Sequence, residues 1–437
     1  MKIEIVSTQA IKPCTVTPPH LRDFKLSFID ERIPPSYIPL ILYYTSNEDS
    51  NISQSEMCDR LKTSLSDALA QFYPLAGRMK GQISVDCNDD GVLYAEATAD
   101  ANVLDIVESP HPQILDDLVP FVTNGYVSDA PEQLAVQVTS FNCGGITIGL
   151  CISHRIADGC TLSSFIKHWA ATARGDGSSG ASPVFNSATL FPPRNTPDFT
   201  PNSNSPSVQP LSPNLVTRRF IFTPSSIQSL QREAAASSGI LKPTRVEVVT
   251  ALIWSRCMAA KGAGNGNGKG KGKSVAYHTL NLRGKVPALS ENSFGNLFQM
   301  IRAESGAAEA GWVPLVGKLR AAFDKVDDEY VKRLLGEKGF DLAKENFMEI
   351  SRVLAAGDVE VFRFSSYCRF AVYGGDFGWG RPVWVSNSSY RNKNCVFLFD
   401  SVDCSGGIEA WVVMSDRDME RLEQDLEFPS FASCFLS

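Results

Sequence analysis

One histidine in this chain is placed where an imidazole can act as a general base. The chain has five histidines: His20, His111, His154, His168 and His278. Only His154 follows an alternating apolar segment, ITIGLCIS (146–153), which predicts a half-buried strand, and it begins the turn HRIADG (154–159). A strand end in an α/β sheet can hold a reactive side chain at a crevice, where an imidazole can take a proton from an alcohol near neutral pH. The local sequence is equally compatible with a core histidine that is bonded to the backbone.

The carboxylate of Asp158, four residues after His154, has two alternative roles. If the turn is helical, both side chains share a face and Asp158 can orient the imidazole. If the helix begins after Asp158, the carboxylate is a helix N-cap or the partner of a distant arginine. Gly159 and the preceding strand favour the second geometry, so Asp158 is predicted to be structural.

Two other chemistries at His154 have little support. A zinc site would use His154 and Asp158, but no third ligand stands at a familiar spacing. A nucleophilic cysteine could be Cys151, on the same predicted strand, or Cys160, at the start of the following helix. Neither cysteine lies in a recognisable motif, so a general-base role for His154 is the better hypothesis.

The second candidate motif is DFGWG (376–380), followed by Arg381 and Pro382. Asp-Phe-Gly alone is typical of protein kinases, but a kinase also needs an HRDxxxxN catalytic loop upstream and a strand lysine near the N-terminus. Neither is present. Two glycines around Phe377 and Trp379 instead indicate a tight structural turn under a ligand channel.

The elements around these motifs mix helices and strands in both halves of the chain. Residues 55–72 place five apolar side chains on one helical face, and Pro74 and Gly77 end that helix. Residues 162–169 mark another helical face directly after the HRIADG turn. In the second half, Thr244 and Glu247 have capping-box spacing before an apolar helix, and 395–400 and 407–414 read as paired strands.

Two segments lack the periodicity of helices or strands. Residues 175–213 are rich in Pro, Ser, Asn and Gly, which predicts a long crossover between two halves of similar size. Residues 262–273 repeat Gly, Asn and Lys without the GxxxxGK[ST] spacing of a phosphate-binding loop. We therefore expect a solvated loop there.

Net charge, apolar runs and cysteine spacing disfavour several classes of partner and cell compartment. The 437 residues carry a net charge of −7, which disfavours nucleic acid or an anionic membrane as partner. No apolar run has the length of a membrane span, and the N-terminal segment has no secretory signal. Eleven cysteines without CxxC spacing indicate free, mostly buried thiols in the reducing cytoplasm. We therefore expect a cytoplasmic protein without a metal.

HRIADG (154–159) and DFGWGRP (376–382), in this order, resemble the plant BAHD acyltransferase family. The similarity extends along the chain and includes YPLAGR (73–78), VDCNDDGV (85–92), NLR (281–283) and FGN (294–296). VDCNDDGV and the CGG before the strand are most similar to the vinorine-synthase-like branch of alkaloid, terpenoid and alcohol acetyltransferases.

The resemblance implies an α/β fold of two chloramphenicol-acetyltransferase-like domains with mixed sheets, joined by a long crossover loop. The corresponding boundaries are 1–175 for an N-terminal domain with the HxxxD motif, 176–215 for the linker and 216–437 for a C-terminal domain with DFGWG. Acyl-CoA and the acceptor would enter a channel between the domains from opposite faces. The family also implies a monomer.

The resemblance also implies the roles of individual residues. His154 matches the general base, and Asp158 matches an aspartate that pairs with an arginine, here Arg283. Asp376, Gly378 and Gly380 match a loop that supports the fold and the CoA site. A Thr/Ser-Ser-Trp stretch implicated in oxyanion stabilisation reads Ser365-Ser366-Tyr367 here, so Ser365 and Tyr367 are candidates although tyrosine replaces the indole.

The implied reaction is transfer of an acyl group from acyl-CoA, acetyl above all, to a hydroxyl of a plant specialised metabolite. Acyl-CoA is a co-substrate, and no permanently bound cofactor is expected. A longer or branched donor, an amine acceptor, or a non-catalytic scaffold are the alternatives. A scaffold would tolerate loss of the histidine or of DFGWG, and both are intact.

Overall fold

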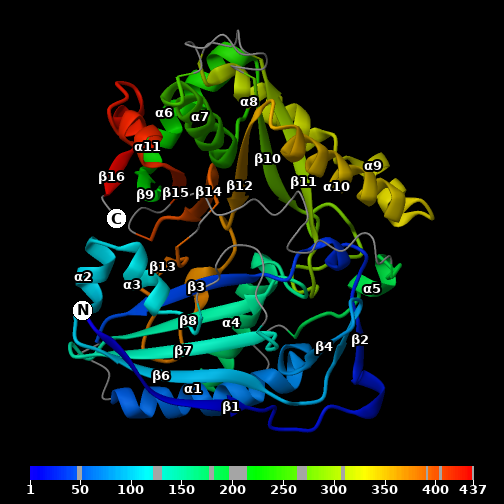
Figure 1. The fold of residues 1–437 in the computed structure, drawn as a ribbon, viewed down its shortest axis with the longest axis vertical. Coiled ribbons are helices and arrows are strands. Elements are labelled where there is room, and N and C mark those ends of the chain that lie inside the picture. The colour runs from blue at the N-terminus through cyan, green and yellow to red at the C-terminus, as the bar shows by residue number, and fades with distance from the viewer. Residues whose placement is uncertain are drawn as a thin grey trace. The chain divides into compact units, whose positions relative to one another are not determined.

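The computed structural model describes residues 1–46, 52–121, 130–176, 182–195, 214–262, 273–306, 311–389, 392–402 and 406–435 (Figure 1). The chain forms two compact units. Unit 1 comprises Met1–Ser205, Val286–Leu297 and Phe370–Ser389, and unit 2 comprises Pro206–Lys285, Phe298–Arg369 and Tyr390–Ser437. Most of the predicted crossover and nearly all of the Gly/Lys-rich segment lie outside the described residues.

Unit 1 is built on a mixed six-stranded sheet with the strand order β1-β6-β7-β8-β3-β13 (Figure 1). The strands are β1 (Ile3–Ile11), β6 (Val92–Ala99), β7 (Leu134–Phe141), β8 (Ile146–Ser153), β3 (Tyr37–Tyr44) and β13 (Trp384–Ser386). β6 and β7 are parallel, and the other pairs are antiparallel. A second sheet has the order β2-β5-β4, from Asp23–Lys25, Ser84–Asp86 and Arg78–Lys80.

The strand that ends at His154 is more deeply buried than its alternating pattern predicted. Every residue of β8 is buried, because the strand lies between β7 and β3 and both of its faces are covered. Gly149 shows how closely one face is covered: a Cβ on this residue would lie 2.0 Å from the Leu118 carbonyl oxygen. The period of the sequence correctly predicted the strand, but not its central place in the sheet.

The α-helices in the described part of unit 1 are α1 (Gln54–Gln71), α2 (Val103–Glu108), α3 (Pro112–Asp117), α4 (Gly159–Arg174) and α5 (Ser187–Leu190). α1 matches the helix predicted at 55–72, and its apolar face, including Leu61 and Leu65, is fully buried. α1 packs against α4, where the Trp169 indole N–H donates to Ser64 Oγ at 3.0 Å. α4 is thereby fixed directly after the HRIADG turn.

The two units interleave along the chain, whereas the boundaries expected at 175 and 216 divide it into consecutive segments. Val286–Leu297 and Phe370–Ser389 come from the second half of the sequence but belong to unit 1. The physical reason in the second case is strand pairing, because Trp384–Ser386 forms the edge strand β13 beside β3. The DFGWG motif therefore lies in unit 1, and not in the expected C-terminal domain.

Unit 2 contains a mixed seven-stranded sheet with the order β11-β10-β12-β14-β15-β9-β16. The strands are β11 (Phe298–Ser305), β10 (Ser274–Asn281), β12 (Glu360–Ser366), β14 (Cys395–Asp400), β15 (Ile408–Ser415), β9 (Leu215–Phe222) and β16 (Ser433–Phe435). β12 is parallel to both neighbours, β10 and β14. The predicted pairing of the strands near 395–400 and 407–414 is confirmed by the antiparallel pair β14 and β15.

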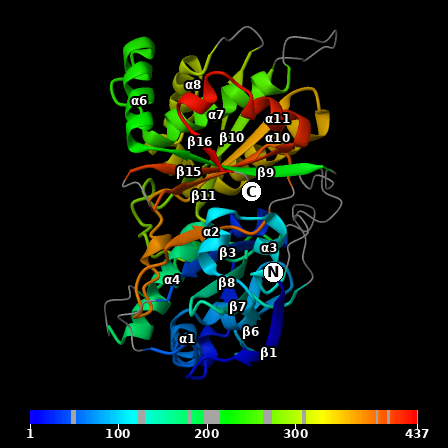
Figure 2. The same ribbon diagram turned by 90° about the vertical axis from the view of Figure 1, so that its left-hand side faces the viewer.

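The α-helices that accompany this sheet in the described residues are α6 (Pro224–Ser238), α7 (Arg245–Ala260), α8 (Val313–Asp324), α9 (Asp328–Leu335), α10 (Gly339–Ala356) and α11 (Asp416–Glu423). Figure 2 shows α6, α7 and α11 on the same side of the sheet. The predicted capping box is present at α7, where Glu247 N–H donates to Thr244 Oγ1 and Thr244 N–H donates to the Glu247 carboxylate. α7 is almost entirely buried, as its apolar sequence indicates.

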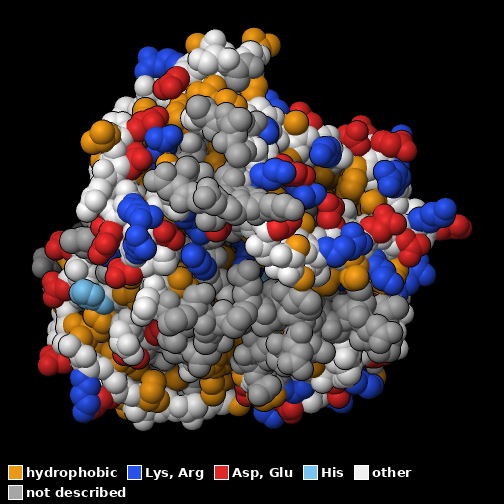
Figure 3. Space-filling model, turned by 45° about the horizontal axis from the view of Figure 1, so that its top comes forward, with side chains coloured by type: hydrophobic (Ala, Val, Ile, Leu, Met, Phe, Trp, Pro, Cys, Tyr) orange, Lys and Arg blue, Asp and Glu red, His pale blue; other side chains and the backbone are white. Residues whose placement is uncertain are grey.

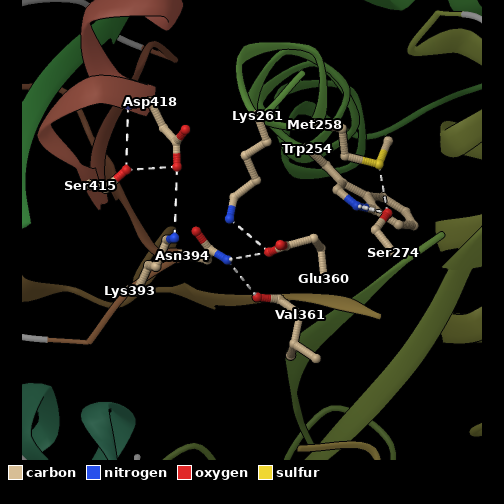
Figure 4. Close-up of polar contacts among 10 residues, drawn as sticks. All are labelled: Trp254, Met258, Lys261, Ser274, Glu360, Val361, Lys393, Asn394, Ser415 and Asp418. Atoms are coloured by element: carbon tan, nitrogen blue, oxygen red, sulfur yellow. Dashed lines mark hydrogen bonds and ion pairs between the residues drawn. The ribbon is translucent and has the colours of Figure 1, made fainter. Parts of the chain in front are cut away.

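A polar network joins the C-terminal end of α7 to the starts of β12 and β14 (Figure 4). Lys261 Nζ lies 2.7 Å from Glu360 Oε2, and Asn394 Nδ2 donates to Glu360 Oε2 and to the Val361 carbonyl. Desolvation lowers the pKa of Lys261, while the Glu360 carboxylate opposes that shift. Asn394 has φ 60°, a left-handed conformation that asparagine tolerates well. The network thus links the adjacent ends of the parallel strands β12 and β14 to the end of α7.

The surface of the described residues carries mixed charge. On the face shown in Figure 3, basic and acidic side chains are interspersed. No helix within the described ranges has both the length and the apolar character needed to cross a membrane. The ten cysteines that the structure describes are free thiols, and four of them (Cys87, Cys151, Cys257 and Cys395) are buried.

His278 makes unit 2 sensitive to acid. Its imidazole is buried in β10 and stacked on Phe364, and desolvation lowers its pKa to about 4. The unfolded chain therefore binds a proton more readily than the folded one between pH 6.5 and about 4, so stability falls as pH falls through this window. The full loss is about 3 kcal/mol.

Replacing His278 with phenylalanine should remove this part of the pH dependence. We expect His278→Phe to unfold at nearly the same urea concentration as wild type above pH 6.5, and at a higher one near pH 4.5. Urea titrations of both proteins across this range measure the difference. His20→Phe, at an exposed histidine, is the control and should follow wild type. Parallel curves for His278→Phe and wild type would contradict the assignment.

Candidate active site

The backbone of His154 is fixed by a hydrogen bond at its N–H and another at its carbonyl. Its N–H donates to the Ser36 carbonyl at 2.7 Å, which continues the pairing of β8 with β3 by one residue. Its own carbonyl accepts from Asn296 Nδ2 at 2.7 Å. The residue is partly exposed, unlike its neighbours Ser153 and Arg155, which are buried. The predicted strand–turn–helix order is present, with β8 before the turn and α4 after it.

The hydrogen bond of the imidazole defines its tautomer. His154 Nδ1 lies 3.0 Å from the Ala157 carbonyl oxygen. A carbonyl oxygen can only accept, so Nδ1 carries the hydrogen in this contact and Nε2 is the unprotonated nitrogen of the neutral ring. Desolvation lowers the pKa of His154, whereas the Asp158 charge and the Ala157 hydrogen bond act in the opposite direction. A neutral ring near pH 7 suits a proton acceptor.

Asp158 is the N-cap of α4, one of the two structural roles that the sequence left open. Its Oδ1 accepts from Thr161 N–H at 2.8 Å, and its Oδ2 accepts from Leu297 N–H at 3.0 Å. The carboxylate therefore connects the start of α4 to the Val286–Leu297 segment of unit 1. Thr161 adds to this connection, because its Oγ1 lies 3.1 Å from the Gly295 carbonyl oxygen.

A buried network behind His154 was not recognised from the sequence. Asp30 Oδ1 accepts from both Asn296 N–H (2.7 Å) and Asn296 Nδ2 (2.9 Å), and Asp30 Oδ2 accepts from Ser27 N–H and Oγ. Desolvation raises the pKa of Asp30, which is 1 % exposed. Asn296 belongs to the FGN motif noted above, but no local pattern assigns a partner that is 266 residues away.

The DFGWG loop is organised by its own aspartate. Asp376 Oδ1 accepts from Gly378 N–H at 2.9 Å and from Gly380 N–H at 3.1 Å. Both glycines have positive φ values, +108° and +109°, which side chains other than glycine rarely adopt. Phe377 is fully buried against Trp169 of α4. These contacts belong to a tight turn packed on α4.

The backbone conformation of Gly380 can be tested by substitution. A Cβ at Gly380 would meet nothing within 4 Å, so Gly380→Ala changes only the backbone preference. We expect a loss of about 1–3 kcal/mol in unfolding free energy. Gly81→Ala is the matched control, since that site is also open but has φ +65°, inside the left-handed region that L-residues can reach. Equal melting temperatures for the two variants would contradict strain at Gly380.

Three predicted site residues lie in unit 2. Arg283 is buried, and its backbone N–H and Nη1 both donate to Asn281 Oδ1. Ser365 lies near the end of β12, and Tyr367 follows that strand with its ring stacked on Phe399 at 4.7 Å. Pairing of Arg283 with Asp158, and participation of Ser365 or Tyr367 in oxyanion stabilisation, stay predictions. Over the described ranges, no group of three or more His, Cys, Asp or Glu side chains could hold a metal ion.

Comparison with known proteins decides the family. Residues 1–429 match the Transferase family. The chain belongs to this family, the BAHD acyltransferases. It is 35 % identical to epi-neemfruitin B synthase from Melia azedarach, with 99 % of each chain covered, and 34 % identical to stemmadenine O-acetyltransferase from Catharanthus roseus, with 97 % of each covered.

Solved structures agree with this family. The crystal structure of vinorine synthase superposes with a TM-score of 0.84 and 31 % identity over 99 % of both chains. An F. sporotrichioides protein solved with coenzyme A and T-2 shares the fold at 17 % identity, with a TM-score of 0.73 over 94 % of this chain and 99 % of that one. The predicted α/β class with two acyltransferase domains and mixed sheets is confirmed, and this BAHD protein is an acyltransferase.

Proposed function

We propose that this BAHD acyltransferase transfers an acetyl group from acetyl-CoA to a hydroxyl of a plant specialised metabolite, with His154 as general base. The observation that carries the role of His154 is its Nδ1 contact with the Ala157 carbonyl, which leaves Nε2 as the basic nitrogen of a neutral ring. The acetyl donor and the acceptor class are supported by the acetyltransferase names of the relatives in Melia azedarach, Citrus sinensis and Catharanthus roseus.

The proposed reaction has two stages. His154 Nε2 takes the proton of the acceptor hydroxyl as its oxygen attacks the thioester carbonyl carbon, forming a tetrahedral oxyanion. The C–S bond then breaks, the CoA thiolate leaves and receives the proton from His154, and the ester is released. General-base assistance of this kind contributes about 10²- to 10⁴-fold in rate. No acyl-enzyme is needed when both substrates are bound together.

The remaining site residues have supporting roles in this proposal. Asp158 holds α4 and pairs with Arg283, and Asp376, Gly378 and Gly380 support the fold and the CoA site. An oxyanion needs a hydrogen-bond donor, and the hydroxyls of Ser365 and Tyr367 are the candidates. We further propose a cytoplasmic monomer without a permanently bound cofactor; the free thiols of the described cysteines suit a reducing compartment.

The function is tested by mass spectrometry of the purified protein with acetyl-CoA and a panel of alkaloid, limonoid and simple alcohols. We expect an acetylated product that is absent with His154→Ala. Product formation only with a longer acyl-CoA would change the donor and keep the mechanism. Absence of any product together with absence of CoA binding would contradict the proposal and favour a scaffold role.

The pH dependence of the rate should report the basic nitrogen. Because desolvation lowers the pKa of His154, the neutral ring persists below pH 6.5 and the rate is lost only when pH falls through that lowered pKa. We expect the acid limb of kcat/KM to have its midpoint below pH 6.5. A midpoint clearly above 6.5, with the protein folded throughout, would mean that another group limits the reaction.

A further inference from the structure

A separate cavity of about 300 Å³ lies in unit 1 at the end of the six-stranded sheet. Ten residues line it: Pro35, Ser36, Tyr37, Arg78, Met79, Ala130, Pro131, Gln133, Ser153 and Arg155. His154 is not among them, although both of its neighbours in sequence are. The cavity is therefore distinct from the site built around the imidazole.

Strand pairing places three residues of the cavity lining side by side at one end of the sheet. Tyr37 of β3 pairs with Ser153 of β8, and Ser153 N–H donates to the Gln133 carbonyl beside β7 at 2.8 Å. These three residues form one row across neighbouring strands, and all three line the cavity. Ser153 is the last residue of β8 and Arg155 lies in the turn that follows, while the imidazole of His154 between them is directed to the Ala157 carbonyl.

Two deeply buried side chains of the lining have atoms without hydrogen-bond partners. They are Arg155 Nε, a donor, and Gln133 Oε1, an acceptor; the two residues are 8 % and 2 % exposed. Each side chain also makes one hydrogen bond within the protein: Arg155 Nη2 donates to the Gln82 carbonyl, and Gln133 Nε2 donates to the Pro131 carbonyl at 3.2 Å. An unmet buried polar group costs about 1–3 kcal/mol. A ligand or bound water in the cavity would relieve that cost.

The charges around the cavity are already compensated within the protein. Arg78 Nη1 donates to the Gly77 and Gly91 carbonyls, and Arg78 Nη2 lies 3.9 Å from the Glu132 carboxylate. The charge of Arg155 interacts with the carboxylates of Asp30 and Glu31. An anionic ligand would compete with these carboxylates, and a cation would meet two guanidinium groups. The lining therefore favours a neutral ligand.

Much of the remaining lining is apolar, although Ser36 and Ser153 add hydroxyl groups. Pro35, Pro131, Met79 and Ala130 contribute only carbon and sulfur side-chain surface, next to the aromatic ring of Tyr37. A ligand for this cavity thus needs C–H surface together with groups that both donate and accept hydrogen bonds. Hydroxyl groups on a compact carbon ring have these properties.

We propose that this cavity binds a neutral polyhydroxylated small molecule of the sugar or cyclitol class. One of its hydroxyls accepts from Arg155 Nε, and another donates to Gln133 Oε1. The site adds a second binding function to the chain, separate from acyl transfer, and it shares the backbone of residues 153–155 with the general base.

The test uses saturation-transfer NMR on the full-length protein with myo-inositol and D-glucose as probes. We expect saturation of at least one probe by wild type, and about tenfold weaker binding by Gln133→Met, which keeps the length of the side chain but removes its acceptor. Gln9→Met, at an exposed position of β1, is the matched control and should bind like wild type. His154→Ala should also retain binding, because His154 is not part of the cavity lining.

A wild-type crystal soaked with myo-inositol gives the second measurement. It tests the site even if the Gln133→Met protein folds poorly. Ring-shaped density that meets Arg155 Nε and Gln133 Oε1 would support the proposal. Water molecules alone in the cavity, with no saturation of either probe by wild type, would overturn it. Saturation that is unchanged in Gln133→Met but lost in His154→Ala would also overturn it, because the probes would then occupy the catalytic site.

Discussion

His154→Ala should reduce turnover by at least about 10²- to 10⁴-fold while acetyl-CoA binds almost as tightly as before. The expected loss is in kcat, because removal of Nε2 leaves the acceptor hydroxyl without a positioned base as it attacks the thioester. The backbone N–H and carbonyl that fix residue 154 to Ser36 and Asn296 are unchanged by the substitution. Product formation by mass spectrometry and CoA binding by calorimetry measure the two effects separately.

His111→Ala is the matched control for this experiment. His111 is an exposed histidine of unit 1 at the start of α3, and its side chain makes no capping hydrogen bond. This variant should keep the activity and melting temperature of wild type. Added imidazole should partly restore product formation in His154→Ala, since a free base can then enter the space. Retention of most activity in a folded His154→Ala protein would remove the general-base assignment.

Local elements of this fold could be predicted where one short pattern determines them. Thr244 and Glu247 predicted the start of α7, because both halves of a capping box lie within one turn. The alternating residues 146–153 and the Gly159 that follows the turn likewise predicted a strand, a turn and a helix around His154. The positions of these elements follow from contacts over a few residues.

The surroundings of the site could not be predicted in the same way, because they depend on pairings between distant segments. β13 joins the sheet of unit 1 by pairing with β3, although Trp384 and Tyr43 are far apart in sequence. Asp30, whose carboxylate anchors Asn296 behind His154, lies in a segment with no motif. A buried aspartate becomes recognisable only when the four hydrogen bonds it accepts are seen together.

Because Asp158 has a structural role, its substitution should mainly lower stability, whereas substitution of His154 should lower kcat. Asparagine at this position keeps an oxygen for Thr161 N–H but can place its amide NH₂ against Leu297 N–H, where Asp158 Oδ2 now accepts. Two donors would then face each other in a site where Asp158 is 6 % exposed. We expect Asp158→Asn to lower the unfolding free energy by about 1–3 kcal/mol.

Ser53→Ala is the control that separates the loss of a helix cap from the loss of the connection to Leu297. Ser53 caps α1 in the same unit through an exposed capping box, and its removal should cost about 1 kcal/mol without an effect on kcat. Asp158→Asn should be less stable than Ser53→Ala, because the wild-type Asp158 carboxylate also fixes the Val286–Leu297 segment. That segment in turn holds the His154 carbonyl through Asn296. The fraction of Asp158→Asn that stays folded should retain a measurable kcat, unlike His154→Ala. If Asp158→Asn melts like wild type and is as inactive as His154→Ala, the carboxylate acts on the imidazole directly and its structural assignment is wrong.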